Sequence, residues 1–321
     1  MTRPWHGPWQ FPFLVVACLV VAGSLRWERT LPPLESVERP PYELALGLAR
    51  WPCLIFVLAV IGVLVGVPVI SLIWKAGLSG NPQAWSAHVI RFHLAKEFHV
   101  RGELIAMSLL VAAGCGLLTS ALGLLLCWLA TGARWFHALT LALMAIVWAM
   151  PGPILGIGMK DAINYVLTLI PVEPLEVALY RGPSPLPNLW VNTVRFFPCA
   201  VAVLWPVVRL IPVSLRDAAR VDGAAPRQEF QHVILPLALP ACLRAGFAVM
   251  VLSLGELGAC KLVATPGSMT FAQEVFVQMH YGVNSDLAAL CLILLAMVAC
   301  GGALFAAVNW WLRAWGSGLD R

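Results

Sequence analysis

One carboxylate stands inside an otherwise apolar stretch of the chain, at Glu256. If the apolar run that begins near Ala241 crosses a membrane as a helix, Glu256 lies about 15 residues into it, roughly 22 Å along the axis. A carboxylate at that depth is costly unless it faces water or a partner, so it is a candidate for lining a polar path. The alternative is a structural acid that pairs with Lys261 or hydrogen-bonds across helices. Small neighbours that allow close helix approach join it as candidate pathway residues: Gly255, Gly258 and Ser253.

Other residues that could do chemistry do not form a catalytic or metal-binding pattern. The nine cysteines fall almost entirely in apolar runs without a CxxC pair, so we interpret them as small apolar filler. His88, His93 and His99 lack the i, i+4 spacing that sets two ligands on one helix face. The chain also lacks an HExxH motif, twin aspartates at membrane depth and the phosphate-binding GxxxxGK[ST] motif. We therefore expect no catalytic residue and no metal ligand.

The composition is that of a membrane protein. Hydrophobic residues make up 60% of the 321 residues and charged residues 12%, with a mean hydropathy of +0.83. Soluble domains carry about 25% charged residues. The net charge is +5, but the lysines and arginines are spread over many short loops and form no basic stripe, which argues against a nucleic-acid partner.

Apolar runs predict an all-α polytopic protein. Each run is read as a helix because the backbone in lipid can satisfy its hydrogen bonds within its own turns, and the runs are too continuous for barrel strands. The first run is short and is followed by a charged, proline-rich stretch, so we divide the chain into an accessory amino-terminal part, 1–50, and a transmembrane domain, 51–321. The predicted spans are Phe11–Leu25, Trp51–Trp74, Glu103–Ala130, Phe136–Gly158, Leu189–Ile211, Ala241–Val263 and Leu287–Leu312.

The positive-inside rule predicts the orientation. Placing the loop before Trp51 in the cytoplasm puts a larger set of arginines inside than the opposite choice does. The amino terminus is then outside, the carboxyl terminus inside, and the loop at 213–240 faces the cytoplasm. The arginines placed inside are Arg26, Arg29, Arg39, Arg50, Arg134, Arg216, Arg220, Arg227, Arg313 and Arg321.

The 213–240 loop has the local signals of two short helices. Ser214 with Asp217 three residues on is an approximate capping box, which predicts a helix start. Gly223 has the conformational freedom to end that helix, and Pro226 suits the first turn of a second one. Pro236 and Pro240 mark the approach to the next span.

Small and apolar residues give this loop the character of a docking element. Ala218 and Ala219 let another surface approach the first helix closely, and Phe230, Val233 and Ile234 lie on one face of the second helix at i, i+3 and i+4. An ordinary amphipathic loop on the membrane interface explains the same residues. Local physics leaves the two interpretations open.

The spacing within the loop resembles a known signature. Asp217-Ala218-Ala219, then Gly223, then Val233, one residue, and Leu235-Pro236 is similar to the EAA signature of binding-protein-dependent ABC importer permeases. Asp217 stands where that family usually has Glu, and Val233 where it often has Ile. The resemblance implies a six-helix, MetI-like type I core plus one extra amino-terminal helix. It also implies that the loop couples to an ATPase through Asp217, Ala218, Ala219, Asp222, Gly223, Phe230, Val233, Leu235 and Pro236.

Further segments resemble a subset of these permeases. The stretch Met150–Gly158 is similar to a Pro-Gly stretch in the third core helix of these permeases. The stretches Leu252–Ala259, Pro266-Gly267 and Met279–Gly282 resemble the ferric-iron and related permeases, including thiamine and phosphonate types. The resemblance implies import by alternating access across a bacterial cytoplasmic membrane, with ferric iron as one candidate solute. The implied partners are a cytoplasmic ATPase dimer that carries ATP and Mg, a second permease half, an outer solute-binding protein and membrane lipid, with no cofactor in this chain.

Two other function classes remain as alternatives. A secondary transporter would show broken helices in two matching halves, and the break at Pro151 and Pro153 has no obvious counterpart in the sequence. An intramembrane enzyme would need a paired acid, a nucleophile with a base, or a metal cluster. The transported solute, and whether the second half is a copy of this chain, are left open by the sequence.

Overall fold

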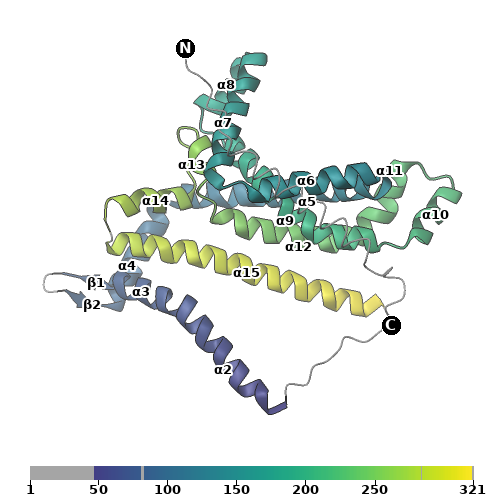
Figure 1. The fold of residues 1–321 in the computed structure, drawn as a ribbon. Helices are drawn as coiled ribbons and strands as arrows, with labels where there is room; N and C mark the ends of the chain where they lie inside the picture. Colours follow the sequence, from purple (N-terminus) through teal and green to yellow (C-terminus); the bar gives the residue numbers. More distant parts are fainter. Residues whose placement is uncertain (1–46, 81–82, 283, 320–321) are drawn as a thin grey trace, which may run out of the picture.

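Proline positions and the lengths of the apolar runs divide the chain into helices. The computed structural model describes residues 47–80, 83–282 and 284–319, so the predicted helix Phe11–Leu25 lies outside the described residues. Among those described, the only strands are β1 (Leu78–Ser79) and β2 (Ala84–Trp85), an antiparallel pair. The all-α prediction is confirmed (Figure 1).

Five described helices are long and apolar enough to cross a membrane, or six if one bent pair counts as a span. The five are η2–α2–η3–α3 (Gly47–Ala76), α5 (Gly102–Gly132), α9 (Leu186–Leu210), the run Pro226–Leu254, and the part Ser285–Trp310 of α15 (Ser285–Leu319). The run Pro226–Leu254 consists of α11 (Pro226–Glu229), η5 (Phe230–Ile234) and α12 (Leu235–Leu254).

The predicted single span Phe136–Gly158 is wrong as one helix. The structure has α6 (Arg134–Ala149) and α7 (Gly152–Leu169), bent by 113° at the break. Pro151 lacks an N–H and disfavours helical backbone in the residue before it, so Met150 is extended, with φ −78° and ψ 123°. In Figure 1 α7 rises away from the bundle that α6 joins.

The predicted span Ala241–Val263 is also displaced. Helix α12 begins at Leu235 with Pro236 in its first turn, keeps Pro240 inside, and ends at Leu254 with Gly255 as its C-cap. The two prolines therefore lie within the helix instead of marking an approach to it. Residues after Gly255 form a turn that leads to the separate short helix α13 (Cys260–Val263).

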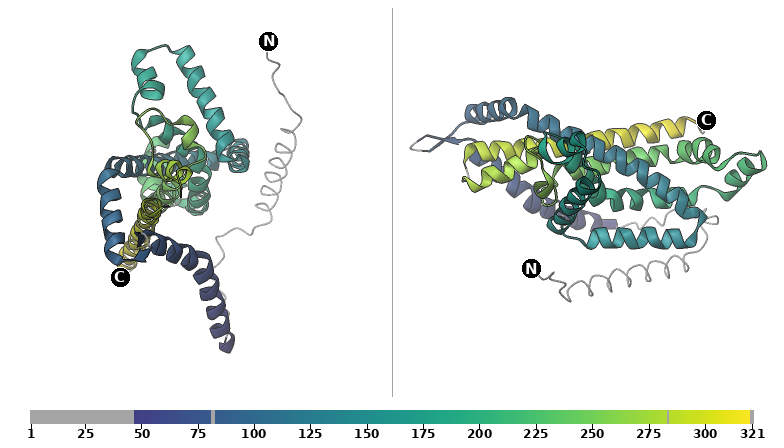
Figure 2. Two further views of the ribbon diagram at one scale, coloured as in Figure 1. Left: turned by 90° about the vertical axis from the view of Figure 1, so that its left-hand side faces the viewer. Right: turned by 90° about the horizontal axis from the view of Figure 1, so that it is seen from above.

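The core lies where α5, α9 and α12 pack together, with α15 running alongside α12 (Figures 1 and 2). Glycines allow the closest approach: a Cβ added to Gly116 of α5 would lie 2.3 Å from the carbonyl oxygen of Gly246 in α12. The largest cluster of buried apolar residues includes Leu124, Leu204 and Ile234, one from each of the packed runs. The three helices thus form a rigid centre that positions the loop after α9.

Helices also form between the predicted spans. Residues 76–102 form β1, β2 and α4 (Ala87–Val100), and residues 159–188 continue α7 into α8 (Glu173–Glu176) and η4 (Val177–Arg181). On α4, His93 Nδ1 lies 2.6 Å from Asp286 Oδ1 on α15. Helix α14 (Phe271–His280) lies at the same end of the bundle as β1 and β2 (Figure 1).

Candidate functional site

The loop after α9 forms a short helix that ends at a glycine. Helix α10 runs Val213–Val221 with Pro212 as its N-cap and no side-chain cap, so the predicted Ser214 and Asp217 capping box is wrong. The reason is that the helix starts one residue before Ser214. Gly223 has φ +82°, a left-handed conformation that glycine adopts without a Cβ penalty. Its N–H donates to the Arg220 carbonyl at 3.0 Å, so the predicted helix end at Gly223 is confirmed.

The second helix starts at Pro226, as predicted. The Ala225 N–H donates to Gln228 Oε1 at 2.8 Å and thereby satisfies one unpaired donor at the helix start. The predicted apolar face is confirmed: Ile234 is fully buried, Val233 is partly buried, and the Phe230 ring lies 4.9 Å from the Trp128 ring of α5. The second helix is thereby anchored on the bundle.

Helix α10, in contrast, stands free of the core. It buries no residue completely, and it lies at the end of the bundle opposite β1, β2 and α14 (Figure 1). The Asp217 side chain is 59% exposed, and Ala218 is exposed while Ala219 is partly buried. Asp222 and Gly223 are exposed at the turn, and Leu235 and Pro236 on the outer side of the next helix. The predicted coupling residues therefore divide into an exposed group around α10 and Gly223 and a packed group at Phe230 and Val233.

A buried carboxylate that the sequence prediction missed joins the two helices. Glu229 of α11 has a side chain that is only 4% exposed. Its Oε1 accepts a hydrogen bond from Arg216 Nε at 2.7 Å, and its Oε2 accepts one from Arg220 Nε at 3.1 Å. The partners are 13 and 9 residues away, so no helical spacing predicts the contact. Only the turn at Gly223 brings them together.

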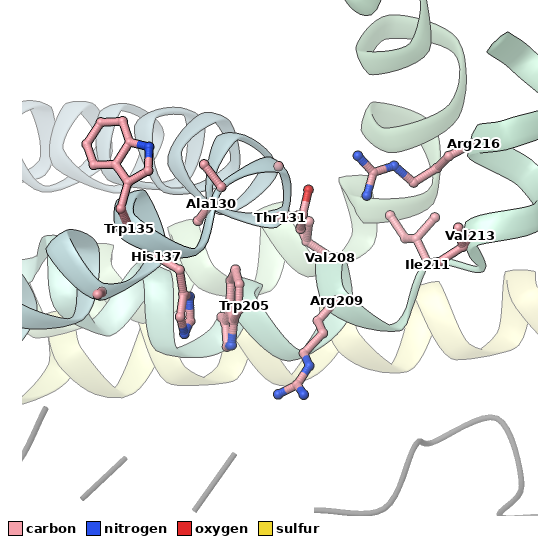
Figure 3. A pocket seen from close by; sticks show the side chains of 13 residues that line it. Ala130, Thr131, Trp135, His137, Trp205, Val208, Arg209, Ile211, Val213 and Arg216 are labelled. Carbon is pink, nitrogen blue, oxygen red and sulfur yellow. The ribbon is translucent and has the colours of Figure 1, made fainter. Parts of the chain in front are cut away.

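A pocket of about 950 Å³ opens beside the base of α10 (Figure 3). It is lined by the ends of α5, α6, α9 and α10. Arg216 and Val213 lie on one side of it, and the stacked rings of His137 and Trp205, 4.2 Å apart, lie on the other. Arg209 extends from α9 between these two groups. The first turn of α10, at Val213 and Arg216, is therefore open to solvent at this pocket.

Glu256 occupies a different place from the predicted one. It lies in the turn after α12 instead of deep within a span, and its Oε1 accepts a hydrogen bond from the Ala259 N–H at 3.0 Å. Its Oε2 lies 4.0 Å from Arg195 Nε on α9, whereas Lys261 Nζ lies 3.9 Å from the Phe276 ring centroid. The charged partner of Glu256 is thus across the helices, and the suggested pairing with Lys261 is wrong.

The neighbours of Glu256 differ in what they contact. Ser253 is buried, and its hydroxyl accepts a hydrogen bond from Asn192 Nδ2 at 2.8 Å. Gly258 lies against the start of α7, where a Cβ would sit 3.4 Å from Pro153 Cδ. Gly255 is exposed, with no atom within 4 Å of its would-be Cβ. Of the candidate pathway residues, Gly255 therefore faces open space, Glu256 is partly buried with a side chain that is 14% exposed, and Ser253 packs between α9 and α12.

In the part of the chain that the structure describes, no group of three or more His, Cys, Asp or Glu side chains could hold a metal ion. The His93 side chain contacts the Asp286 carboxylate through Nδ1.

Comparison with known proteins gives relatives of one kind. The trehalose transport system permease protein SugB of Mycobacterium tuberculosis is 31% identical over 172 residues, 53% of this chain and 60% of that protein. The putrescine transport system permease protein PotI of Escherichia coli is 31% identical over 128 residues, 40% of this chain and 44% of that protein. The chain thus spans about half the length of these relatives. No family model matches.

A solved structure shares the fold. A chain from the crystal structure of a bacterial ABC transporter involved in the import of the acidic polysaccharide alginate aligns with a TM-score of 0.57 and 15% identity. The alignment covers 81% of this chain and 96% of that one. The chain therefore shares the all-α fold of that transporter chain. In sequence, the chain is similar to permease proteins of transport systems.

Proposed function

We propose that this chain is the membrane-spanning permease subunit of an ATP-driven ABC importer. The observation that carries the proposal is the element α10–Gly223–α11, an exposed helix joined by a tight turn to a helix that continues into α12. Its sequence resembles the EAA signature at Ala218, Ala219, Gly223 and Leu235-Pro236, with Asp217 in the place of the usual Glu. An element of this kind can receive a push from a docked protein and pass it to a membrane helix.

In this proposal the exposed group and the packed group have different tasks. Asp217, Ala218 and Ala219, with the turn at Asp222 and Gly223, contact a cytoplasmic ATPase, because all of them except the partly buried Ala219 are exposed on the loop. Phe230 and Val233 fix the second helix on the bundle, and the uninterrupted helix through Leu235 and Pro236 carries motion into α12. ATP and Mg belong to the ATPase, because the chain has no phosphate-binding motif of its own.

The assembly follows from the same proposal. Two permease halves surround a path that opens alternately to each side, and an outer solute-binding protein delivers the solute. The proposal includes the division of the chain into 1–50 and 51–321. It also places the chain in the bacterial cytoplasmic membrane, with the amino terminus outside and the carboxyl terminus inside. A phosphatase-fusion series tests the orientation: activity of fusions within 213–240 would overturn it.

The candidate path passes Glu256 and the exposed Gly255, at the break that α6 and α7 leave. The solute is not specified by these residues. One relative is named for the transport of a disaccharide, trehalose, and the other for the transport of a polyamine, putrescine. The solved structure belongs to a transporter involved in the import of a polysaccharide. Ferric iron is supported by the motif resemblance alone.

Purification of the full chain from its native membrane tests the proposal. An ATPase subunit should co-purify, and it should be lost on deletion of residues 217–224 or in Gly223→Asp. Gly80→Asp is the matched control, because Gly80 also has a positive φ, +85°, and directly follows β1, which lies at the opposite end of the bundle from α10. A solute-binding protein that co-purifies would carry its solute, which mass spectrometry identifies. A lone chain that moves solute without ATP would instead support a secondary transporter, and a catalytically active lone chain an intramembrane enzyme.

A further inference from the structure

The position of α10 is not fixed by apolar packing. Val213, Leu215 and Val221 are 58%, 47% and 87% exposed, and no residue of the helix is completely buried. A helix of nine residues in water is not stable by itself, so contacts with the rest of the molecule must hold it. Its backbone connections are the extended residues at Ile211 and Pro212 and the single turn at Gly223.

Glu229 supplies the missing contact. Its side chain is 4% exposed, and each carboxylate oxygen accepts one hydrogen bond from a different arginine of α10, Arg216 at 2.7 Å and Arg220 at 3.1 Å. Arg216 and Arg220 are four residues apart and therefore project from the same face of α10. One carboxylate thus contacts a full turn of the helix. Charge-assisted hydrogen bonds of this kind are stronger than neutral ones, and they are screened less when buried.

The other charged contact of α10 cannot replace this one. Asp217 Oδ1 lies 3.7 Å from Arg220 Nη1, and both side chains are more than half exposed, at 59% and 57%. An exposed pair within a single helix contributes little and does not connect α10 to another element. Glu229 is therefore the charged group that ties α10 to the helix leading into α12.

We propose that Glu229 is a positioning residue for coupling: through Arg216 and Arg220 it holds α10 at a fixed angle to α11 and α12. This inference rests on the proposed function, since the purpose of the fixed angle is to make α12 move when a docked ATPase moves α10. Glu229 itself is buried and does not contact the ATPase. Its effect on docking is indirect and runs through the two arginines.

The test uses the full chain purified from its native membrane, with Glu229→Gln as the variant. Glutamine keeps the shape and removes the charge. We expect hydrogen exchange of the amides in α10 to accelerate by about tenfold, with exchange in α12 unchanged, and recovery of the ATPase subunit to fall by about tenfold. Glu176→Gln is the matched control: Glu176 also pairs with an arginine at 2.7 Å, but on an exposed segment remote from α10.

A second variant separates positioning from general destabilisation. If Glu229 acts through the arginines, Glu229→Gln has no further effect on α10 exchange in the Arg216→Gln and Arg220→Gln double variant, because the contact is already lost. An additive effect on α10 exchange would overturn the inference. Unchanged α10 exchange in Glu229→Gln would also overturn it, and so would accelerated α10 exchange in that variant together with full recovery of the ATPase. Failure of the unaltered chain to bring down any ATPase would overturn the proposed function instead, and the exchange result would still decide whether Glu229 holds α10.

Discussion

Arg195 and Glu256 meet at the break between α6 and α7, with Nε 4.0 Å from Oε2. Arg195 Nη1 also donates to the Met150 carbonyl at 2.5 Å, at the carboxyl end of α6. Glu256 Oε1 lies 3.2 Å from the position that a Cβ on Gly152 would take, at the amino end of α7. A cation favours the carboxyl end of a helix and an anion the amino end. The pair therefore places each charge beside the helix end that it stabilises.

The first prediction concerns this pair. Glu256→Gln keeps an oxygen for the Ala259 N–H but removes the charge that faces Arg195, whose side chain is 26% exposed. We expect faster hydrogen exchange in the first turns of α7 and a fall in uptake of the identified solute of about tenfold, equivalent to about 1.4 kcal/mol. Recovery of the ATPase subunit should not change, because α10 is remote from the break.

Glu173→Gln is the control for this variant, since Glu173 is exposed at the start of α8. It should leave both exchange in α7 and uptake at the level of the unaltered chain. Uptake by Glu256→Gln at the full rate would remove Glu256 from the candidate pathway.

A second prediction isolates the backbone conformation of Gly223. No atom lies within 4 Å of a Cβ built on this residue, so a substitution meets no steric obstacle except its own positive φ. Gly223→Ala should destabilise the turn by about 1 kcal/mol, seen as faster exchange in α10. Gly223→Asn should cost less, because asparagine tolerates this region. Gly132→Ala, which is equally unobstructed but has no positive φ, should have no such effect; equal effects at both glycines would refute the argument.

The apolar runs predicted the long helices well. Glu103–Ala130, Leu189–Ile211 and Leu287–Leu312 agree with α5, α9 and α15 except at their ends, because a long apolar run in lipid has no alternative to the helix. The errors came where a local backbone signal interrupts an apolar run: Pro151 splits one predicted span, and Gly255 ends another before Glu256.

The candidate site was predictable only where its signals are local. Gly223 and Pro226 act on the backbone at their own positions, so the turn and the second helix start could be read directly. The contact of Glu229 with Arg216 depends on the path of the chain through that turn. The contact of Glu256 with Arg195 joins two helices that are distant in sequence, and it cannot be derived from spacing.

A third prediction tests the close approach of α5 and α12. Gly116→Ala would put a methyl group 2.3 Å from the Gly246 carbonyl oxygen, which is backbone and cannot rotate away. The helices must separate, and we expect a loss of about 1–3 kcal/mol in the free energy of unfolding. Gly158→Ala provides the contrast: its Cβ meets no atom within 4 Å in α7, so the better helix propensity of alanine should leave stability unchanged or raise it by about 0.5 kcal/mol. Thermal unfolding of the purified chain in detergent compares the two, and a destabilisation of equal size in both variants would contradict the prediction.

The last prediction concerns the end of the bundle opposite α10, where Arg101 lies between two carboxylates. Arg101 contacts Glu97, which is 1% exposed, and its Nε donates to Glu274 Oε1 at 3.0 Å. Arg101→Gln removes the guanidinium, so among the residues that the structure describes Glu97 keeps Lys96 Nζ, at 3.5 Å, as its one charged partner. A buried carboxylate that loses its main partner is costly, and we expect the free energy of unfolding to fall by about 2–3 kcal/mol. In the control Arg181→Gln, the lost pair with Glu176 is exposed, so the change should stay within about 0.5 kcal/mol. Similar melting temperatures for the two variants would mean that Glu97 finds water or Lys96 as a sufficient substitute, and that the junction of α4, α5 and α14 does not depend on Arg101.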